Sequence, residues 1–471
     1  MIGIILKKEL RTYFRSGIFI TLAIAIIALI IAAATLSSQR ISAFERERTA
    51  AEFVDKDVWV NQGERNPHAA AHFARYAFKP LTEFATFDPG ITDHSGMALW
   101  MEAHYQNPAV FRRIEDMGEA ARLAELSPAW ILQYIAPLFI FLILFGAVAG
   151  EREAGTLRQM ATSGIGSRAV VIGKLLGAIL VFALILTPAV LISVFFNQTH
   201  DFAPILPDSP LRFAGLLILY CGFTFTIGAL AIGVSALFKE KRNALILLVG
   251  IWALSFMMMP RLGSSLATTI YPQPETVTIS QDLSKAATAA GSDKVYQVKI
   301  QQEALTAYNV SNVKDLPINY VGYTLQKAEE YSYPLFERIY SEIEATYQGQ
   351  EMVLDWVSFM SPVIAMKKLS SGLSGSDRIH QKAFTSAVEQ HRRETVQLLN
   401  GDYMRKGKGS MRYAANEELW QQVKDFSYIP PRFTSNIQSY ALSIILLIVY
   451  FLGSFVFAFW AVKRSYKRLA S

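Results

Sequence analysis

Long apolar runs constrain this chain more than any other feature of its sequence. A helix of about 20 apolar residues crosses the hydrocarbon core of a bilayer, which is roughly 30 Å thick. Six runs are near or above that length, and we expect transmembrane helices at residues 17–36, 129–150, 169–196, 211–238, 244–259 and 437–461. Because 52% of the 471 residues are hydrophobic and only 18% are charged, the chain is predicted to be a mainly α, polytopic membrane protein.

Basic residues beside the apolar runs predict the orientation. Residues 1–16 mix basic and apolar side chains, as in an amphipathic elbow helix on a membrane surface, and the basic ones are Lys7, Lys8, Arg11 and Arg15. The tail at 462–471 is also basic. Positively charged segments stay on the cytoplasmic side, so both termini are expected there. The net charge of +6 follows from this distribution, and no nucleic-acid partner is predicted.

Two long polar stretches are expected on the opposite side of the membrane. Residues 37–127 and 261–434 have the composition of soluble domains, and we predict two extracytoplasmic, periplasmic domains. The apolar residues between Ala43 and Val54 recur at helical spacing, so this part should be helical. The single Cys221 lies within an apolar run, which excludes an internal disulfide.

The chain lacks the residues for nucleotide chemistry of its own. Gly173-Lys174-Leu175 resembles the end of a phosphate-binding loop, but the preceding glycine spacing is wrong and no Ser or Thr follows the lysine. The predicted spans contain almost no ionisable residue in their middles, which argues against an ion-driven pump. We therefore expect a protein that is not an enzyme and holds no cofactor, with another subunit supplying the energy.

The polar loop at 151–168 carries the most informative pattern. An elbow, two spans, the sequence Glu-Arg-Glu-Ala-Gly-Thr-Leu-Arg at 151–158 and Gly-Lys-Leu-Leu-Gly at 173–177 follow one another, and this order resembles the permease subunits of ABC-2-type transporters. The stretches beginning at Asn66 and Ser361 further resemble a bacterial subgroup with large periplasmic insert domains. The resemblance implies a cytoplasmic coupling loop that docks on an ATP-hydrolysing subunit through Glu151, Arg152, Glu153, Gly155, Thr156, Leu157 and Arg158.

The same resemblance implies the partners and the activity. Two copies of an ABC ATPase subunit would hold ATP and Mg, and a second permease chain, identical or similar, would complete the complex in the lipid bilayer of a bacterial inner membrane. The carboxylates suit a helix start, Arg158 offers a directional donor, and Leu157 is expected to project as an apolar knob. Because the spans lack charged binding groups, we expect export or extraction of an amphipathic or lipid-like cargo.

Two alternatives to export stay open. In one, the permease moves its periplasmic domains mechanically to drive an envelope partner. In the other, the chain is a membrane-anchored periplasmic binding or metal-dependent module, and the loop is an ordinary connector. His68 and His72 favour the metal because they lie four apart on a helix begun by Pro67, with further ligands available at Glu64, Asp93, His94, Glu102 or His104. Histidines this close are more often hydrogen-bonded within a domain, so metal binding is only the alternative.

Overall fold

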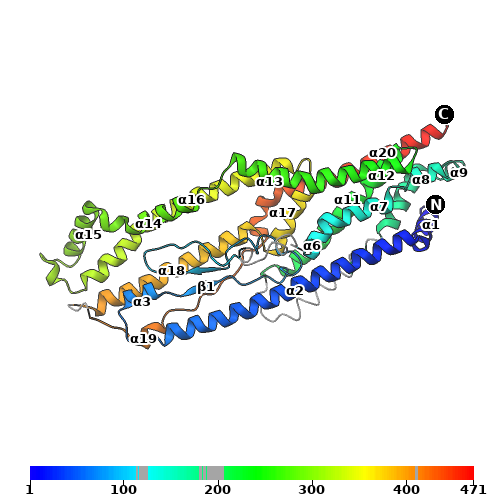
Figure 1. Cartoon of the computed structure of the whole chain (residues 1–471). Helices are drawn as coiled ribbons and strands as arrows, with labels where there is room; N and C mark the ends of the chain where they lie inside the picture. Colours follow the sequence, from blue (N-terminus) through cyan, green and yellow to red (C-terminus); the bar gives the residue numbers. More distant parts are fainter. Residues whose placement is uncertain are drawn as a thin grey trace.

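The computed structural model is an elongated, mainly helical molecule that describes residues 1–112, 115, 126–179, 183, 187, 206–408 and 412–470. Both chain termini lie at one end of the long axis, which we call the terminal end (Figure 1). The prediction of a mainly α, polytopic membrane protein is confirmed. In the described part of the chain, the sheet consists of β1, Tyr76–Phe78, paired antiparallel with β2, Ala98–Trp100.

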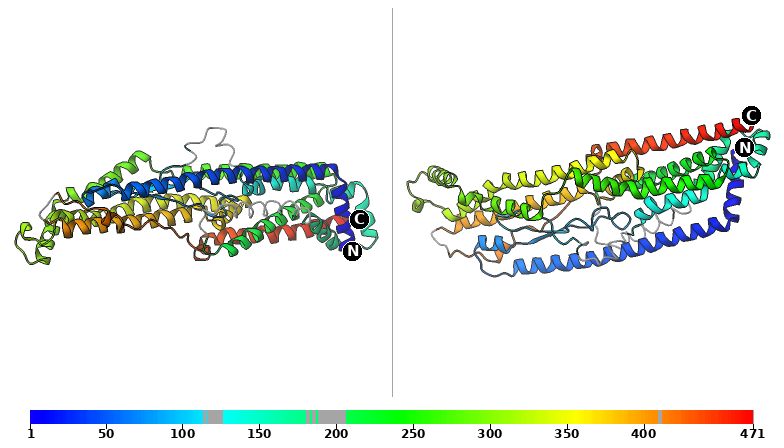
Figure 2. Two further views of the ribbon diagram at one scale, coloured as in Figure 1. Left: turned by 90° about the horizontal axis from the view of Figure 1, so that it is seen from below. Right: turned by 45° about the horizontal axis from the view of Figure 1, so that its top comes forward.

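The elbow forms a helix of its own. α1, Ile2–Arg15, crosses the terminal end, whereas α2, Gly17–Val60, runs along the long axis (Figures 1 and 2). Ser16 separates the two helices with extended backbone, and its hydroxyl accepts a hydrogen bond from the Phe19 N–H at 3.4 Å, which caps α2. α2 then continues for 44 residues, so the predicted span and the predicted helical stripe after it lie on one helix.

Five described helices are long and apolar enough to cross a membrane, and they cover Phe19–Val60, Pro128–Glu153, Ser209–Leu237, Lys241–Ile270 and Thr434–Arg468. Their elements after α2 are α6 (Pro128–Trp130), π-helical η1 (Ile131–Ile135), α7 (Ala136–Leu144), α11 (Ser209–Leu237), α12 (Lys241–Ile251), π-helical η2 (Trp252–Met258), α13 (Met259–Ile270), η4 (Thr434–Tyr440) and α20 (Ala441–Ala470). The helix at 167–179 begins the span predicted at 169–196, much of which lies outside the described residues. The count of six spans therefore stays a prediction.

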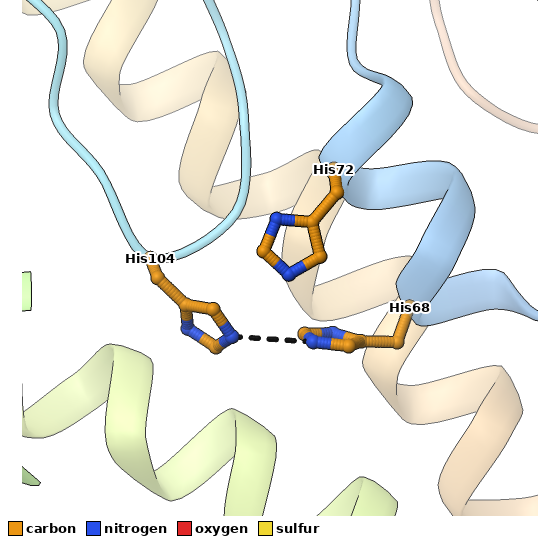
Figure 3. Close-up of side chains that lie close together, drawn as sticks. All are labelled: His68, His72 and His104. Atoms are coloured by element: carbon orange, nitrogen blue, oxygen red, sulfur yellow. Dashed lines mark hydrogen bonds between the residues drawn. The ribbon is translucent and has the colours of Figure 1, made fainter. Parts of the chain in front are cut away.

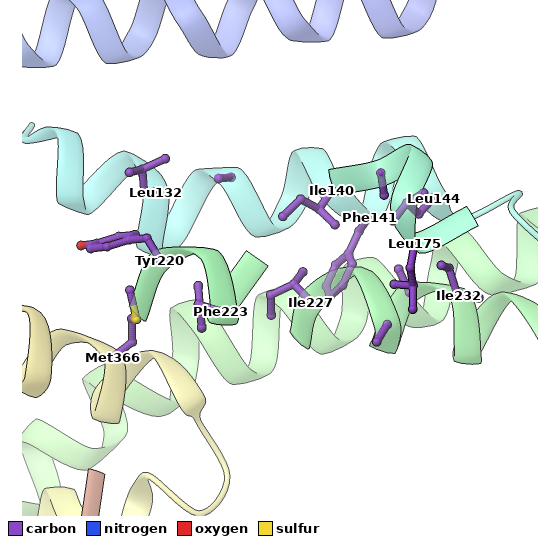
Figure 4. Packing of buried hydrophobic residues seen from close by; sticks show 14 of the residues in the cluster. Leu132, Ile140, Phe141, Leu144, Leu175, Tyr220, Phe223, Ile227, Ile232 and Met366 are labelled. Carbon is purple, nitrogen blue, oxygen red and sulfur yellow. The ribbon is translucent and has the colours of Figure 1, made fainter. Parts of the chain in front are cut away.

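The apolar core of the bundle is built around α11, which packs against both α7 and α20. Phe141 on α7 and Ile227 on α11 are at most 1% exposed and belong to one cluster (Figure 4). Met366, on α17 (Pro362–Ser374), extends this core next to Tyr220 of α11, whose hydroxyl hydrogen-bonds to Ser370 at 2.9 Å. Helices in a bilayer gain little from removing apolar side chains from water, so close van der Waals packing of these side chains holds α7, α11 and α17 together.

The described parts of segments 37–127 and 261–434 form a projection that extends away from the bundle (Figure 1). Its remaining elements are α3 (Pro67–Phe73), α14 (Thr276–Ser292), α15 (Lys294–Ala307), η3 (Val313–Asp315), α16 (Tyr320–Val357), α18 (Arg378–Lys406) and α19 (Glu417–Trp420). The two segments share a core: the buried rings of Trp59 and Trp420 meet edge to face, 5.8 Å apart, and the Trp59 indole N–H donates to the Trp420 carbonyl at 3.1 Å. They therefore pack as one body.

A buried arginine joins the bundle to the projection. Arg212, at the start of α11, is 0% exposed, and its guanidinium lies 2.5 Å from the Asp208 carboxylate. It also donates to the carbonyls of Gly372 at 2.9 Å and Pro431 at 2.7 Å, which lie on α17 and in the segment before η4. A planar guanidinium supplies several donors in fixed directions, so one side chain holds three stretches of backbone together.

Candidate functional site

The predicted coupling loop folds as two short helices at the terminal end. α8, Ala149–Glu153, and α9, Thr156–Thr162, are joined by a turn at Ala154 and Gly155 (Figure 1). Gly155 has a φ of 73°, a left-handed conformation that disfavours residues with a side chain by roughly 1–2 kcal/mol. The glycine in this pattern therefore allows the chain to reverse between the two helices.

Glu151 ties the loop to the elbow helix. Its carboxylate accepts hydrogen bonds from Lys8 of α1 and from the Thr156 hydroxyl, and it lies 3.3 Å from the Lys174 ammonium. Lys174 also donates to Glu9 of α1 at 2.6 Å, and its side chain is only 1% exposed. A buried charge needs such paired partners because its hydration is lost. The loop, the elbow and the helix after the loop thus meet at one buried cation.

Two glycines allow the elbow to approach so closely. On the helix at 167–179, a Cβ at Gly173 would lie 2.7 Å from the Ile5 side chain, and a Cβ at Gly177 would lie 3.0 Å from Glu9. Small residues four apart let helix backbones pack tightly in a membrane. Gly173 and Lys174, which suggested a nucleotide loop at first sight, therefore serve the packing of α1.

Arg152 and Glu153 contact the ends of neighbouring helices. The Arg152 guanidinium donates to carbonyls at the C-terminal end of α11, including that of Ala236 at 3.2 Å, and to the Ser465 hydroxyl of α20. The Glu153 carboxylate accepts a hydrogen bond from the backbone N–H of Lys241, the first residue of α12, at 2.7 Å. A cation suits a helix C-terminus and an anion suits an N-terminus. Both side chains thereby connect the loop to the spans.

Leu157 points into the protein. It is 0% exposed and belongs to the core of the bundle, so the prediction of a projecting knob is wrong and the residue anchors α9 instead. The sequence shows only that Leu157 is an apolar residue within a polar loop. Such a residue can pack in a pocket of a partner or in the core of its own chain, and the sequence pattern is the same in both cases. The loop residues that are exposed include Glu153, Gly155 and Arg158.

The elbow helix presents two different faces. Tyr13 and Glu9 are buried against the bundle, and burial, followed by the nearby Glu9 carboxylate, raises the pKa of Tyr13 well above its usual value. Lys8 faces Glu151, while the outer face exposes Phe14 together with the basic residues Lys7, Arg11 and Arg15. Apolar and basic side chains on one face suit the surface of a membrane.

Sequence reasoning missed three groups that hold this site together: Glu9, Lys174 and Ser235. The Ser235 hydroxyl accepts from the backbone N–H groups of Val148 and Ala149, at 3.0 and 3.1 Å, at the start of α8. Glu9 and Lys174 are opposite charges placed among apolar residues of two predicted helices. Since a buried charge needs a partner, the sequence could have predicted that these two residues form an ion pair.

The two predicted metal candidates also come together. His68 and His72 lie on α3, and His104, in the stretch after β2, completes a group of three histidines among the described residues. The other side chains considered as ligands, Glu64, Asp93, His94 and Glu102, do not belong to this group.

Comparison with known proteins agrees with this architecture. Residues 4–466 match the family model described as "ABC-2 family transporter protein". The comparison with curated proteins gives no match. The matched region contains the elbow, the loop at 151–168 and both segments of the projection, and it spans nearly the whole chain. The chain therefore belongs to the ABC-2 transporter family and is a membrane permease of an ABC transporter.

Proposed function

We propose that this chain is the transmembrane subunit of an ATP-driven exporter, with the loop at 151–158 docked on a separate ATPase subunit. The observation that carries the proposal is the two-sided construction of the loop. One side exposes Ala154, Gly155 and Arg158, and the other is bonded to the elbow and the spans through Glu151, Arg152 and Glu153. A force applied to the exposed side therefore reaches several helices at once.

Movement of the loop would act on the bundle through specific contacts. Glu151 contacts α1 through Lys8, and Arg152 contacts α11 and α20. Glu153 holds the start of α12. Since these helices each contain or adjoin an apolar span, closure of the ATPase pair would rearrange the bundle.

The proposed complex contains two ATPase subunits, which bind ATP and Mg, and a second permease chain. The span at Lys241–Ile270 supports this second chain, because only 11% of its apolar window is buried within one copy. The complex would lie in a bacterial inner membrane with both termini in the cytoplasm. An apolar bundle surface suits an amphipathic or lipid-like cargo.

A mechanical role is the second candidate, and the continuity of α2 favours it. This helix runs from the terminal end into the projection, and the Arg212 contacts join α11 to α17 at the base of the projection. Movement of the bundle would then move the projection against a periplasmic partner. Reconstitution separates the candidates: vesicles holding only permease and ATPase should translocate a fluorescent lipid if the protein is an exporter, and should not if it only drives a partner.

The docking proposal is tested by native mass spectrometry of the complex purified in detergent from its own host. Arg158→Glu should lower the co-purifying ATPase at least tenfold, and Arg158→Gln should lower it less, because both change the charge of the exposed face. Arg338→Glu, an equal charge change at an exposed site on α16, is the control and should retain the ATPase. Leu157 is unsuitable for this test because it is buried. Wild-type levels of ATPase in both loop variants would refute docking at this loop.

A further inference from the structure

Three histidine rings converge in the projection. His68 and His72 lie one turn apart on α3, and His104 approaches from the stretch after β2 (Figure 3). One ring nitrogen of each lies within 4.8 Å of the others. The ring of His72 lies above the gap between the other two rings and directs a nitrogen toward it (Figure 3). All three rings thus offer a nitrogen to one point.

The Nδ1 atoms of two rings are already engaged by acceptors. His104 Nδ1 lies 2.9 Å from a carboxylate oxygen of Glu329 on α16, and the same oxygen accepts the backbone N–H of His104. His68 Nδ1 lies 3.2 Å from the side-chain oxygen of Asn400 on α18. A carboxylate and a carbonyl oxygen only accept hydrogen bonds, so both rings carry their proton on Nδ1.

A chain of hydrogen bonds fixes the orientation of the Asn400 amide. The Glu330 carboxylate only accepts, so Gln326 directs its NH2 group to it, at 3.3 Å. The Gln326 oxygen then accepts from the Asn400 NH2 group, also at 3.3 Å. The remaining atom, the Asn400 oxygen, faces His68. The tautomer of His68 therefore follows from the Glu330 carboxylate, which is linked to it through Gln326 and Asn400.

These assignments leave two lone pairs facing each other. His68 Nε2 and His104 Nε2 are 3.2 Å apart, and neither neutral ring has a proton at that position (Figure 3). Two nitrogens bound to a tetrahedral zinc ion, each at about 2.0–2.1 Å, are separated by about 3.3 Å. The spacing of the two nitrogens already matches this value, and a cation between them would remove the repulsion.

We infer that His68, His72 and His104 form a binding site for a divalent transition metal of the zinc class. Three neutral imidazoles suit Zn²⁺ and its neighbours in the first transition row, whereas Mg²⁺ and Ca²⁺ prefer oxygen ligands. His72 is exposed, so the fourth coordination position opens toward solvent and would be filled by water or by a ligand from a partner. The coupling loop contributes none of these ligands.

The site would link the two segments of the projection. All three ligands come from segment 37–127, whereas Glu329 and Asn400, which orient two of them, come from segment 261–434. Glu329 is itself held by Arg392 at 3.1 Å and is 1% exposed. Outer groups of this kind raise the basicity of a ligating histidine. Because Glu329 and Asn400 would strengthen metal binding only when the segments are docked, bound metal would in turn stabilise their docking.

The test uses the full-length protein, purified with a tag that contains no histidine and stripped with a chelator. Titration with Zn²⁺, followed by metal analysis, should give one ion per chain, and Co²⁺ should develop the visible absorption of a low-coordinate histidine site. Zn²⁺ should also raise the melting temperature. His72→Ala and His104→Gln should abolish tight binding, whereas His94→Ala, an exposed histidine outside the group, should leave it unchanged.

His72 is the key position because its exposed side chain can be removed with little effect on folding. Glu329→Gln should weaken the metal by about 10–100-fold while the three ligands remain. Absence of stoichiometric metal in the wild type, or equal binding by His72→Ala and His94→Ala, would overturn the inference. Uptake of a proton without uptake of metal would also overturn it, since the gap between His68 and His104 would then hold a proton.

Discussion

Lys174 and Arg212 are both buried cations, but their partners differ. Lys174, near the terminal end, lies between the carboxylates of Glu9 and Glu151. Arg212, at the base of the projection, has one carboxylate partner, and its other oxygen partners are backbone carbonyls such as that of Gly372. Carboxylates on flexible side chains can follow a moving cation, whereas carbonyls of a helix end are fixed. The first junction is therefore adjustable and the second is rigid.

Replacement of Arg212 should produce the largest loss of stability. We expect Arg212→Met to lower the free energy of unfolding by about 3–5 kcal/mol, because the Asp208 carboxylate and several carbonyls would lose their donor in a buried place. Arg212→Lys should restore little, since one ammonium cannot replace the planar group. Thermal unfolding in detergent measures both. The exposed Arg432→Met is the control, and equal melting of the two Met variants would contradict a rigid junction.

Replacement of Lys174 should cost less, about 3 kcal/mol, because Glu151 keeps its bond to Lys8 and only Glu9 loses its cation partner. Lys174→Met combined with Glu9→Gln should recover most of this loss, since the orphaned charge is then removed. The melting temperatures of the single and double variants measure the recovery, with Lys7→Met on the exposed face of α1 as control. Failure of the second substitution to help would mean that this junction depends on fixed geometry, like that of Arg212.

Arg378 extends the comparison to a cation near the surface and should give the smallest effect. Its guanidinium lies close to the Glu344 carboxylate, between α18 and α16. Burial acts to raise the pKa of Glu344, but the hydrogen bond and charge of Arg378 outweigh it, so the pKa lies below its usual value. A lowered carboxyl pKa stabilises the fold above the unfolded pKa of about 4.3 and loses this contribution as the pH falls through the folded pKa.

The expected contribution of this pair is about 1 kcal/mol or less, because solvent screens partly exposed charges. Glu344→Gln should therefore lower the stability by this amount near neutral pH and match the wild type in acid, which flattens the acid side of the stability curve. Chemical unfolding between pH 3 and pH 7, about the range in which carboxyl groups titrate, is the measurement. A variant whose stability still falls as steeply as that of the wild type would assign the acid loss to other carboxylates.

The sequence predicted what depends on local pattern. The amphipathic residues of α1 and the presence of long apolar helices follow from composition and spacing, whereas the turn at Gly155 and the continuation of α2 to Val60 were not predicted. Contacts between distant residues leave no such pattern. The packing of Trp59 on Trp420 joins positions far apart in the chain. The sequence around a tryptophan does not tell whether its side chain lies in a core or at a surface.

The candidate site was also predicted only in part. The loop at 151–158 was recognised from its sequence, but the burial of Leu157 depends on contacts that exist only in the folded bundle. Lys174 was weighed as a nucleotide ligand because its neighbours in sequence are glycines, whereas its partners in space lie on α1. His104 was only one of several available ligands until β2 and the stretch after it placed it beside His68.

The length of α2 gives the molecule a mechanical property. At about 1.5 Å per residue, its 44 residues make a rod of about 66 Å, roughly twice the thickness of a bilayer's hydrocarbon core. The rod begins at Ser16, where the only covalent link to the elbow is a single extended residue. A tilt of about 5° at that point would displace the Val60 end by about 6 Å. A rotation of α2 that is too small to open the bundle would therefore still move its Val60 end by about the length of a side chain.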